Sequence, residues 1–188
     1  MSARRYSASS GLRWGLAGAS LSCALVSCGS GAFLAGVLRY FRKNFPGKTA
    51  EAAQDLFGID IDPAALRLAG KNLPEIPEKN FWCADTLKLS LPENQKFDLI
   101  IGNPPYRCGG LRNSASFPAS EQQHLKEIFR YGFEYKMNLF ALFMEQSTRM
   151  AKEFSLIVPD SLLCGRYFSR LRRYLTEKCF LQTLCILD

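Results

Sequence analysis

A short apolar run that ends in two consecutive prolines restricts the fold of this chain more than any other feature. The run FDLIIGNPPY occupies residues 97–106, and its first half is typical of a short buried β-strand. Proline fixes φ and lacks an N–H donor, so Pro104 and Pro105 are expected to end the strand and to hold the next residues stiffly. We therefore expect Asn103 and Tyr106 to lie at a rigid strand end.

The groups at that strand end are suited to a planar ring that carries an exocyclic amine. The carboxamide oxygen of Asn103 and the backbone carbonyl of Pro104 can accept the two amine hydrogens, and Tyr106 can stack on the ring. A simpler interpretation is that the prolines form an ordinary turn and that Tyr106 packs in the core, because Pro-Pro turns are common. The tetrapeptide by itself leaves both interpretations open.

Three other strand ends carry groups that suit a ligand containing a ribose. The sequence Cys-Gly-Ser-Gly at residues 28–31 follows an apolar run and precedes a helical pattern, so its backbone can turn sharply beneath a ligand. Asp60 ends a second apolar run, where a carboxylate can accept hydrogen bonds from ribose hydroxyls, and Asp85 ends a third. Ligands of open parallel sheets bind at the carboxyl ends of the strands, so we expect these groups to line one crevice.

Strand-like and helix-like segments alternate along the chain, which predicts a doubly wound, mostly parallel α/β sheet. We expect strands at 21–27, 55–60, 80–83, 97–101, 154–158 and 181–187, and helices at 31–44, 63–72, 124–130, 138–152 and 166–178. The polar segment 107–123 is long for a connection, and connections of that length are usually functional or mobile.

Composition limits the class of protein. A chain of 188 residues with 47% hydrophobic residues is long enough for one domain with a full core. The net charge of +7 suits a polyanionic partner. Seven cysteines occur without a C-x-x-C pair, which favours reduced thiols in a cytoplasmic protein over a disulfide framework or a zinc site.

Basic and aromatic residues are interleaved near the C-terminus, at Arg166, Tyr167, Phe168, Arg170, Arg172, Arg173 and Tyr174. Such a cluster can contact nucleic-acid phosphates. It is equally typical of an amphipathic helix whose charged face is solvated.

The order of these motifs resembles that of the amino-group DNA methyltransferases that use S-adenosylmethionine, in their adenine-N6 branch. The closest resemblance is to the catalytic region of single-chain restriction-modification enzymes, from about Cys28 to the C-terminus. Three further motifs are similar: YKMNLFALFME at 135–145 to the family's Tyr-x-x-Asn-Leu-Tyr-x-x-Phe-x-Glu, LIVPDSLL at 156–163 to its fifth strand and following loop, and RLRRYL at 170–175 to its Leu-Arg-x-x-Leu helix.

The resemblance implies a Rossmann-like class I methyltransferase fold with S-adenosylmethionine as cofactor and double-stranded DNA as partner. In this family the cofactor site would comprise Cys28, Gly29, Gly31, Asp60, Ile61 and Asp85. The glycines would pass under the methionine part, Asp60 would bind the ribose, Ile61 would cover the adenine ring and Asp85 would meet the adenine amino group.

The same resemblance assigns the transfer reaction to Asn103, Pro104, Pro105 and Tyr106. These residues would hold the amine of an adenine that is flipped out of the duplex, and segment 107–123 would border the DNA groove. Methyl transfer would be a direct in-line displacement that depends on positioning and a polar site. No covalent enzyme intermediate is expected.

The chain departs from the family pattern at both ends and at one internal link. Leu25 stands where the family has an acid, and the link 149–154 lacks the usual Gly-Gly turn. The chain also ends at Asp188, just before the second aromatic that would sandwich the base. We therefore expect an irregular leader at 1–24 and an incomplete methyltransferase domain at 25–188, whose recognition domain belongs to sequence that is not present here.

Two other functions stay open. Glutamine N5-methyltransferases of release factors share Asn-Pro-Pro-Tyr, although they lack the helix motif at 135–145 and the long loop. An inactive fragment of a DNA methyltransferase is the second alternative. A basic and apolar N-terminus that precedes Cys28 also imitates a lipoprotein signal, but cleavage there would remove the first strand, so a cytoplasmic protein is expected.

Overall fold

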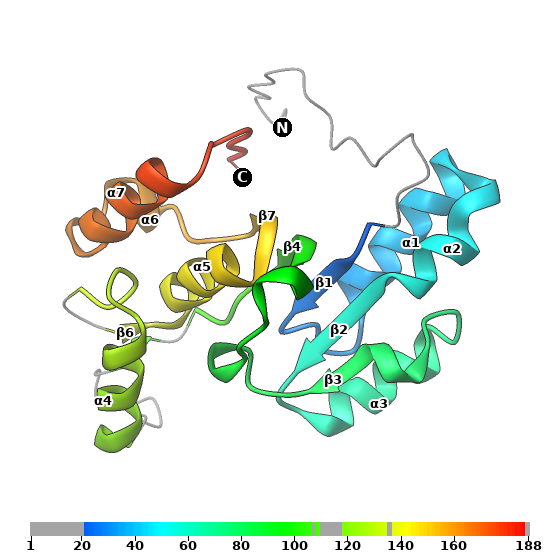
Figure 1. The fold of residues 1–188 in the computed structure, drawn as a ribbon, viewed down its shortest axis with the longest axis horizontal. Helices are drawn as coiled ribbons and strands as arrows, with labels where there is room; N and C mark the ends of the chain where they lie inside the picture. Colours follow the sequence, from blue (N-terminus) through cyan, green and yellow to red (C-terminus); the bar gives the residue numbers. More distant parts are fainter. Residues whose placement is uncertain (1–20, 107, 110–117, 135–136, 187–188) are drawn as a thin grey trace.

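The computed structural model of this chain describes residues 21–106, 108–109, 118–134 and 137–186. Its centre is a parallel sheet in the order β3-β2-β1-β4-β7, with helices on both faces (Figure 1). The strands are β1 (Cys23–Val26), β2 (Leu56–Asp60), β3 (Phe81–Cys83), β4 (Phe97–Gly102) and β7 (Ala151–Leu156). The predicted doubly wound, mostly parallel α/β fold is thereby confirmed.

The helices and smaller elements connect these strands. The α-helices are α1 (Ala32–Asn44), α2 (Thr49–Gln54), α3 (Pro63–Asn72), α4 (Ala119–Ile128), α5 (Leu139–Met150), α6 (Ser161–Cys164) and α7 (Ser169–Lys178). Two 3₁₀ turns matter for the site, η3 (Thr86–Lys88) and η5 (Arg166–Phe168). A small antiparallel pair joins β5 (Cys108–Gly109) to β6 (Met137–Asn138).

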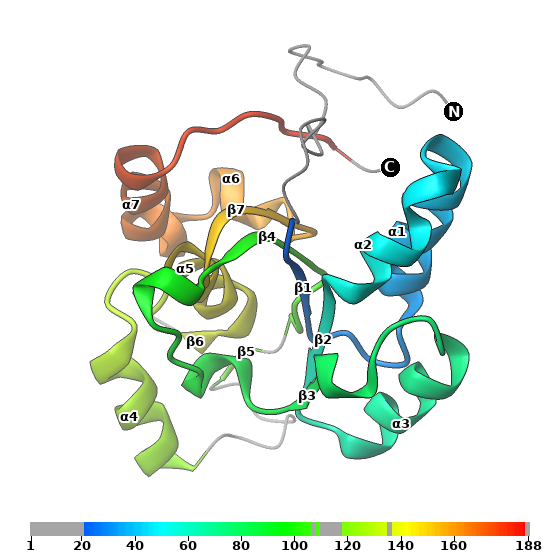
Figure 2. The ribbon, with the colours of Figure 1, turned by 45° about the vertical axis from the view of Figure 1, so that its right-hand side comes forward.

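Alternating residues of the strands enter two different cores. In β1 all four residues are buried; Cys23 and Leu25 pack with α1 and α3, whereas Ala24 and Val26 pack on the side of α5. Figure 2 shows this division, with α1 and α3 on one side of the sheet and α5 and α7 on the other. A strand that is buried on both faces consists of consecutive apolar residues, which explains why β1 could be recognised in the sequence as a continuous apolar run.

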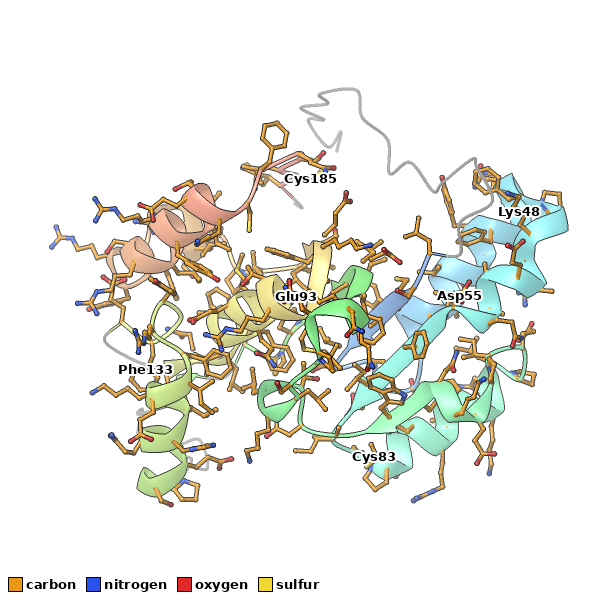
Figure 3. All side chains as sticks on the ribbon, in the orientation of Figure 1. Lys48, Asp55, Cys83, Glu93, Phe133 and Cys185 are labelled. Carbon is orange, nitrogen blue, oxygen red and sulfur yellow. The ribbon has the colours of Figure 1, made fainter. Side chains whose placement is uncertain are left out.

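The buried helix α5 carries three polar residues in its interior face. Among them, Glu145 is completely buried, and its carboxylate accepts hydrogen bonds from the backbone N–H groups of Arg130 (3.2 Å), Tyr131 (2.9 Å) and Gly132 (2.7 Å). The guanidinium of Arg149 donates a further hydrogen bond to the Glu145 carboxylate, at 2.6 Å. A single carboxylate therefore fixes the turn at 129–134. The label of Phe133 in Figure 3 shows where this turn lies, between α4 and α7.

The next residue of α5 ties down a second segment. The carboxamide of Gln146, which is buried, donates hydrogen bonds to the carbonyls of Thr86 (2.9 Å) and Leu89 (2.7 Å). These carbonyls belong to the segment that follows β3. Helix α5 thus holds both the turn at 129–134 and the segment that directly follows Asp85.

At the amino ends of the strands, Asp98 of β4 connects the start of β1 with the start of β7. Its carboxylate accepts hydrogen bonds from the N–H (2.9 Å) and hydroxyl (3.0 Å) of Ser22, and from Lys152 (2.7 Å). Burial opposes ionisation, but the hydrogen bonds from Lys152 and Ser22 outweigh it and hold the pKa of Asp98 below its usual value. The contact fixes the register of β1 against β4 and β7.

Several boundaries differ from the sequence prediction. The helix predicted at 124–130 begins earlier, at Ala119, and β7 begins at Ala151 rather than at residue 154. Helix α5 passes directly into β7 because Ala151 already has extended backbone angles (φ −141°, ψ 161°). The predicted helix 166–178 divides into η5 and α7, and the helices α2 and α6 were not predicted.

The strand predicted at 181–187 is wrong for the part of it that the structure describes. Residues 181–186 have no regular structure, and apolar side chains such as Phe180 (88% exposed) and Leu181 (72%) face solvent. Strand propensity mainly reflects packing against neighbours, so an apolar run without a paired partner does not form a strand. The expected leader lies largely outside the described residues, because residues 1–20 are not among them. Within the described residues, every helix is too short or too polar to cross a lipid bilayer.

We expect Glu145→Gln to lower the free energy of unfolding by about 2–4 kcal/mol, because an amide cannot replace a carboxylate that accepts backbone donors and a guanidinium in a buried site. Urea unfolding at neutral pH measures the change. Glu177→Gln is the matched control, since Glu177 is 64% exposed and pairs with Arg173 only at 3.6 Å. The control should change stability by less than about 0.5 kcal/mol. Equal effects of the two substitutions would contradict the role assigned to Glu145.

Candidate active site

The register of the parallel strands brings their carboxyl ends to one edge. Val26 lies opposite both Ile59 in β2 and Gly102 in β4, and Asp60 lies opposite Cys83 in β3. Cys83 marks this edge in Figure 3. The residues that follow these positions therefore gather at one rim, as the sequence predicted for the ends of four strands.

The loop after β1 has an unusual backbone that two glycines make possible. Gly29 and Gly31 have positive φ angles of 54° and 90°, and Ser27 also has a positive φ of 52°. The N–H of Gly31 donates to the carbonyl of Cys28 at 3.0 Å, and the carbonyl of Gly31 accepts the first hydrogen bond of α1. A Cβ on Gly31 would lie 2.8 Å from a methyl of Leu73, so this loop also packs closely on α3.

Cys28 contributes its backbone to the rim, while its thiol points into the core. The residue is 8% exposed, and its Sγ lies 3.1 Å from the position that a Cβ on Gly58 would occupy. Burial, with a smaller contribution from the charge of Asp60, raises the pKa of the Cys28 thiol to about 12. A thiol in this state is a poor nucleophile.

Asp60 connects the loop after β1 to the end of β2. One carboxylate oxygen accepts a hydrogen bond from the N–H of Gly29 at 2.8 Å, and the other accepts from the N–H of Asp62 at 3.0 Å. Each oxygen retains a second lone pair for a further donor. Ile61, the next residue, is 69% exposed and stands beside this carboxylate on the rim.

Asp85 is placed at the same edge, but its carboxylate already has partners. One oxygen accepts from the N–H of Leu87 at 3.0 Å and caps η3, and the other forms an ion pair with Lys88 at 3.2 Å. Lys88 also pairs with Glu121 of α4 at 3.0 Å. The hydrogen bonds that the Lys88 ammonium donates to the carboxylates of Glu121 and Asp85 raise the pKa of Lys88, and burial opposes them only weakly. The sequence did not predict Lys88 or Glu121 as neighbours of the site, because neither residue lies at a strand end.

The segment after β4 forms the other half of the rim. The hydroxyl of Tyr106 lies at hydrogen-bonding contact with the side-chain oxygen of Asn103 and 3.2 Å from the carbonyl of Ile157. The Tyr106 side chain is 45% exposed, so the interpretation that it packs in the core is wrong. Pro104 is buried, and Pro105 is half-buried.

An aromatic side chain of α5 supports Tyr106 from below. The rings of Tyr106 and Phe140 meet edge to face, with centroids 6.4 Å apart and an interplanar angle of 80°. Phe140 lies within the motif at 135–145, so its position could have been noticed in the sequence. Ile157 acts through its backbone carbonyl, and no side-chain pattern could have revealed it.

Comparison with models of protein families identifies the family of this chain. The model of the Eco57I restriction-modification methylase family matches residues 70–188. The chain belongs to this family. The matched part contains Asp85 and residues 103–106, whereas Gly29 and Asp60 precede it. The motif resemblance to restriction-modification methyltransferases is thereby confirmed.

A curated relative agrees with this assignment. The type II methyltransferase M.TthHB8I of Thermus thermophilus is 28% identical over 127 residues, which are 64% of this chain and 27% of the relative. The chain therefore spans about a quarter of the length of that relative.

Solved structures support the class I methyltransferase fold. The ATP-dependent type ISP restriction-modification enzyme LlaBIII, solved bound to DNA, superposes with a TM-score of 0.64 at 15% identity, over 85% of this chain and 14% of that one. A candidate class I S-adenosylmethionine-dependent methyltransferase from Listeria monocytogenes has a TM-score of 0.61 at 18% identity, over 86% and 46% of the two chains. At such identities the likeness concerns the fold.

Two glycines of the same region should respond to alanine in opposite ways. Gly31→Ala should destabilise the protein by about 1–3 kcal/mol, because alanine is strained at positive φ and its Cβ would crowd α3. Gly36→Ala, inside α1 with open space around its Cβ position, should stabilise by about 0.5–1 kcal/mol. Thermal and urea unfolding of both variants would measure this. A Gly31→Ala protein as stable as the parent would contradict the strained loop geometry.

Proposed function

We propose that this chain carries the catalytic site of an enzyme that transfers a methyl group from S-adenosylmethionine to N6 of adenine in double-stranded DNA. One observation carries the proposal. The glycine loop with Asp60 and the segment 103–106 lie at the same edge of the sheet, on strands β2, β1 and β4, which are direct neighbours. A cofactor on the first group and a substrate amine on the second would therefore meet above β1.

The residues at the edge fit the proposed cofactor. The position of a Cβ on Gly29 has no heavy atom within 4 Å, so a ligand can approach this backbone closely. Gly29 and Gly31 would lie under the methionine part, and the free lone pairs of Asp60 would accept the ribose hydroxyls. The exposed Ile61 would cover the adenine ring. When bound, S-adenosylmethionine supplies an electrophilic methyl group on a positively charged sulfur.

Asp85 would accept a hydrogen bond from the amino group of the cofactor's adenine. Its carboxylate is shared with Leu87 and Lys88, so it offers its remaining lone pairs rather than a free charge. This arrangement favours a neutral donor over a second cation. The role proposed for Asp85 is thus compatible with its ion pair.

Asn103 and Pro104 would hold the amine that receives the methyl group. The contact with the Tyr106 hydroxyl orients the Asn103 carboxamide, because its oxygen faces that donor and still has a lone pair for an amine hydrogen. The Pro104 carbonyl would accept the second hydrogen, and Tyr106 would stack on the flipped base. Two acceptors on one nitrogen favour a geometry in which its lone pair points at the methyl donor. Positioning of this kind is the main contribution of the protein to a direct displacement.

DNA as the substrate is supported by family membership and by charge. The family is one of restriction-modification methylases, and LlaBIII was solved in complex with DNA. The net charge of +7 favours binding of a polyanion. The choice of adenine over cytosine rests on the resemblance of the tetrapeptide and its motif order.

The cofactor assignment predicts the effect of one carboxylate. Asp60→Ala should weaken the binding of S-adenosylhomocysteine, measured by calorimetry, by about 1.5–3 kcal/mol, or roughly 10–150-fold. Asp62→Asn is the control, because the Asp62 side chain caps α3 by accepting from Ala64 at 2.8 Å and asparagine can cap equally well. Unfolding of the ligand-free variants distinguishes a lost ligand contact from a disordered loop. Equal affinities of Asp60→Ala and parent would refute the ribose assignment.

The transfer assignment predicts that Asn103→Ala loses about 100-fold or more of methyl transfer to DNA while cofactor binding is retained. Tritiated S-adenosylmethionine as donor, followed by nucleoside analysis of the DNA, measures both the rate and the methylated position. Asn44→Ala is a suitable control, because this exposed asparagine lies on α1 and donates to the carbonyl of Tyr40 in the same helix. Label on cytosine, or on a protein glutamine instead of DNA, would overturn the proposed substrate.

A further inference from the structure

Three exposed arginines on η5 and α7 form a basic surface that the proposed chemistry does not use. Arg166, Arg170 and Arg173 lie on the solvent side of this segment, and we call them the arginine surface. The opposite side of the segment is apolar, since Phe168 and Leu171 pack against α5. The three side chains are therefore directed outward by the amphipathic pattern of the segment.

The turn η5, which carries Arg166, lies close to the candidate substrate site. Phe140 of α5 contacts the ring of Tyr106 on one side and the ring of Phe168 on the other, the second pair with centroids 5.1 Å apart. Phe168 directly follows the exposed Tyr167 and closes η5. One buried ring thus separates the base-stacking tyrosine from the turn that carries Arg166.

Three sets of contacts hold this segment in place. The guanidinium of Arg172 donates to the carbonyls of Leu162 (2.9 Å) and Gly165 (2.7 Å), which locks η5 and α6 to α7. Glu134 caps α7 by accepting from the hydroxyl of Ser169 (2.6 Å) and the N–H of Arg170 (3.1 Å). The arginine surface is consequently built on a rigid support.

The third set is aromatic. The rings of Tyr131 and Tyr174 stack with centroids 4.1 Å apart and an angle of 12°, and the Tyr174 hydroxyl lies 2.8 Å from that of Thr148. The turn that bears Tyr131 is the one that the buried Glu145 fixes. The arginine surface is thereby linked to the core of α5.

The charge of the surface is strongly positive in spite of two acidic neighbours. Residues 161–178 contain five basic side chains and one acidic one, Glu177, which lies 3.6 Å from Arg173. Burial works against ionisation of Glu134, but the hydrogen bonds from Ser169 and Arg170 outweigh it and hold its pKa below the usual value. Among the described residues, no acid forms an ion pair with Arg166. An excess of guanidinium groups remains for an external anion.

We propose that the arginine surface binds phosphates of the DNA backbone beside the adenine that Tyr106 receives. This rests on the proposed function and adds to it the surface on which the duplex lies. Guanidinium groups bind phosphate oxygens through two parallel hydrogen bonds, and DNA presents a charge about every 1.7 Å along its axis. A duplex that delivers a base to Tyr106 brings neighbouring phosphates to η5 and the first turns of α7. Such contacts carry no sequence information and fix the position of the duplex.

The test compares two triple variants of equal charge. In the first, Arg166, Arg170 and Arg173 are replaced by glutamine; in the control, Arg39, Lys43 and Lys71 are replaced by glutamine. The control residues are exposed and lie on α1 and α3, across the sheet from α7 (Figures 1 and 2). Binding of a short fluorescent duplex is measured at several salt concentrations, and binding of S-adenosylhomocysteine is measured by calorimetry.

The first variant should bind the duplex at least about tenfold more weakly, and its slope of log affinity against log salt should be shallower by about 2–3, or roughly one per lost phosphate contact. The control should change the slope by less than about 1, and both variants should bind S-adenosylhomocysteine like the parent. Equal losses in the two variants would mean that only total charge matters and would overturn the proposal, as would a parent that binds no duplex. A parent that binds duplex but not S-adenosylhomocysteine would instead refute the proposed cofactor and leave the surface standing.

Discussion

The buried carboxylate of Glu145 is the interaction that joins helix α5 to the turn at 129–134, and α5 in turn supports two parts of the candidate site. An ionised group without solvent is tolerated only when its oxygens are fully hydrogen-bonded, and here three backbone donors and one guanidinium supply those bonds. The helix that carries Glu145 also contributes Gln146 to the segment after β3 and Phe140 to the support of Tyr106. Loss of the Glu145 carboxylate would leave buried backbone donors and the Arg149 guanidinium without their acceptor and would weaken the attachment of α5 to the turn.

The two halves of the rim are joined to the sheet in different ways. On the side of β1 and β2, one carboxylate oxygen of Asp60 accepts a hydrogen bond from the N–H of Gly29, which ties the loop after β1 to the end of β2. On the side of β4 and β7, the Tyr106 hydroxyl reaches the carbonyl of Ile157, which links two neighbouring strand ends. Both links use the short separation of adjacent parallel strands. Because β1 and β4 are hydrogen-bonded neighbours, the halves share one rigid base.

The sequence predicted the framework of this site better than its contacts. Continuous apolar runs followed by Gly, Asp or Asn identified β1, β2 and β4, since such runs are required where both faces of a sheet are covered. The same reasoning put Gly29, Asp60 and Asn103 at one edge, as observed. It failed for residues 181–186, the described part of the last predicted strand, where the apolar pattern was present but a paired neighbour was not. It also missed Lys88, Glu121 and the Ile157 carbonyl, because these act through tertiary contacts or backbone atoms that leave no periodic signal.

The polar groups at the rim are already engaged by the protein before any ligand is considered. Asp60 accepts two backbone donors, Asp85 accepts one donor and a cation, and Asn103 faces the Tyr106 hydroxyl. Each of these oxygens can accept a second hydrogen bond, so internal partners fix their directions without exhausting them. A ligand that uses the remaining lone pairs would meet acceptors that need little reorganisation, and preorganised dipoles of this kind contribute most to the stabilisation of a transition state. The internal contacts at the rim are thus a physical condition for the proposed reaction rather than competitors of it.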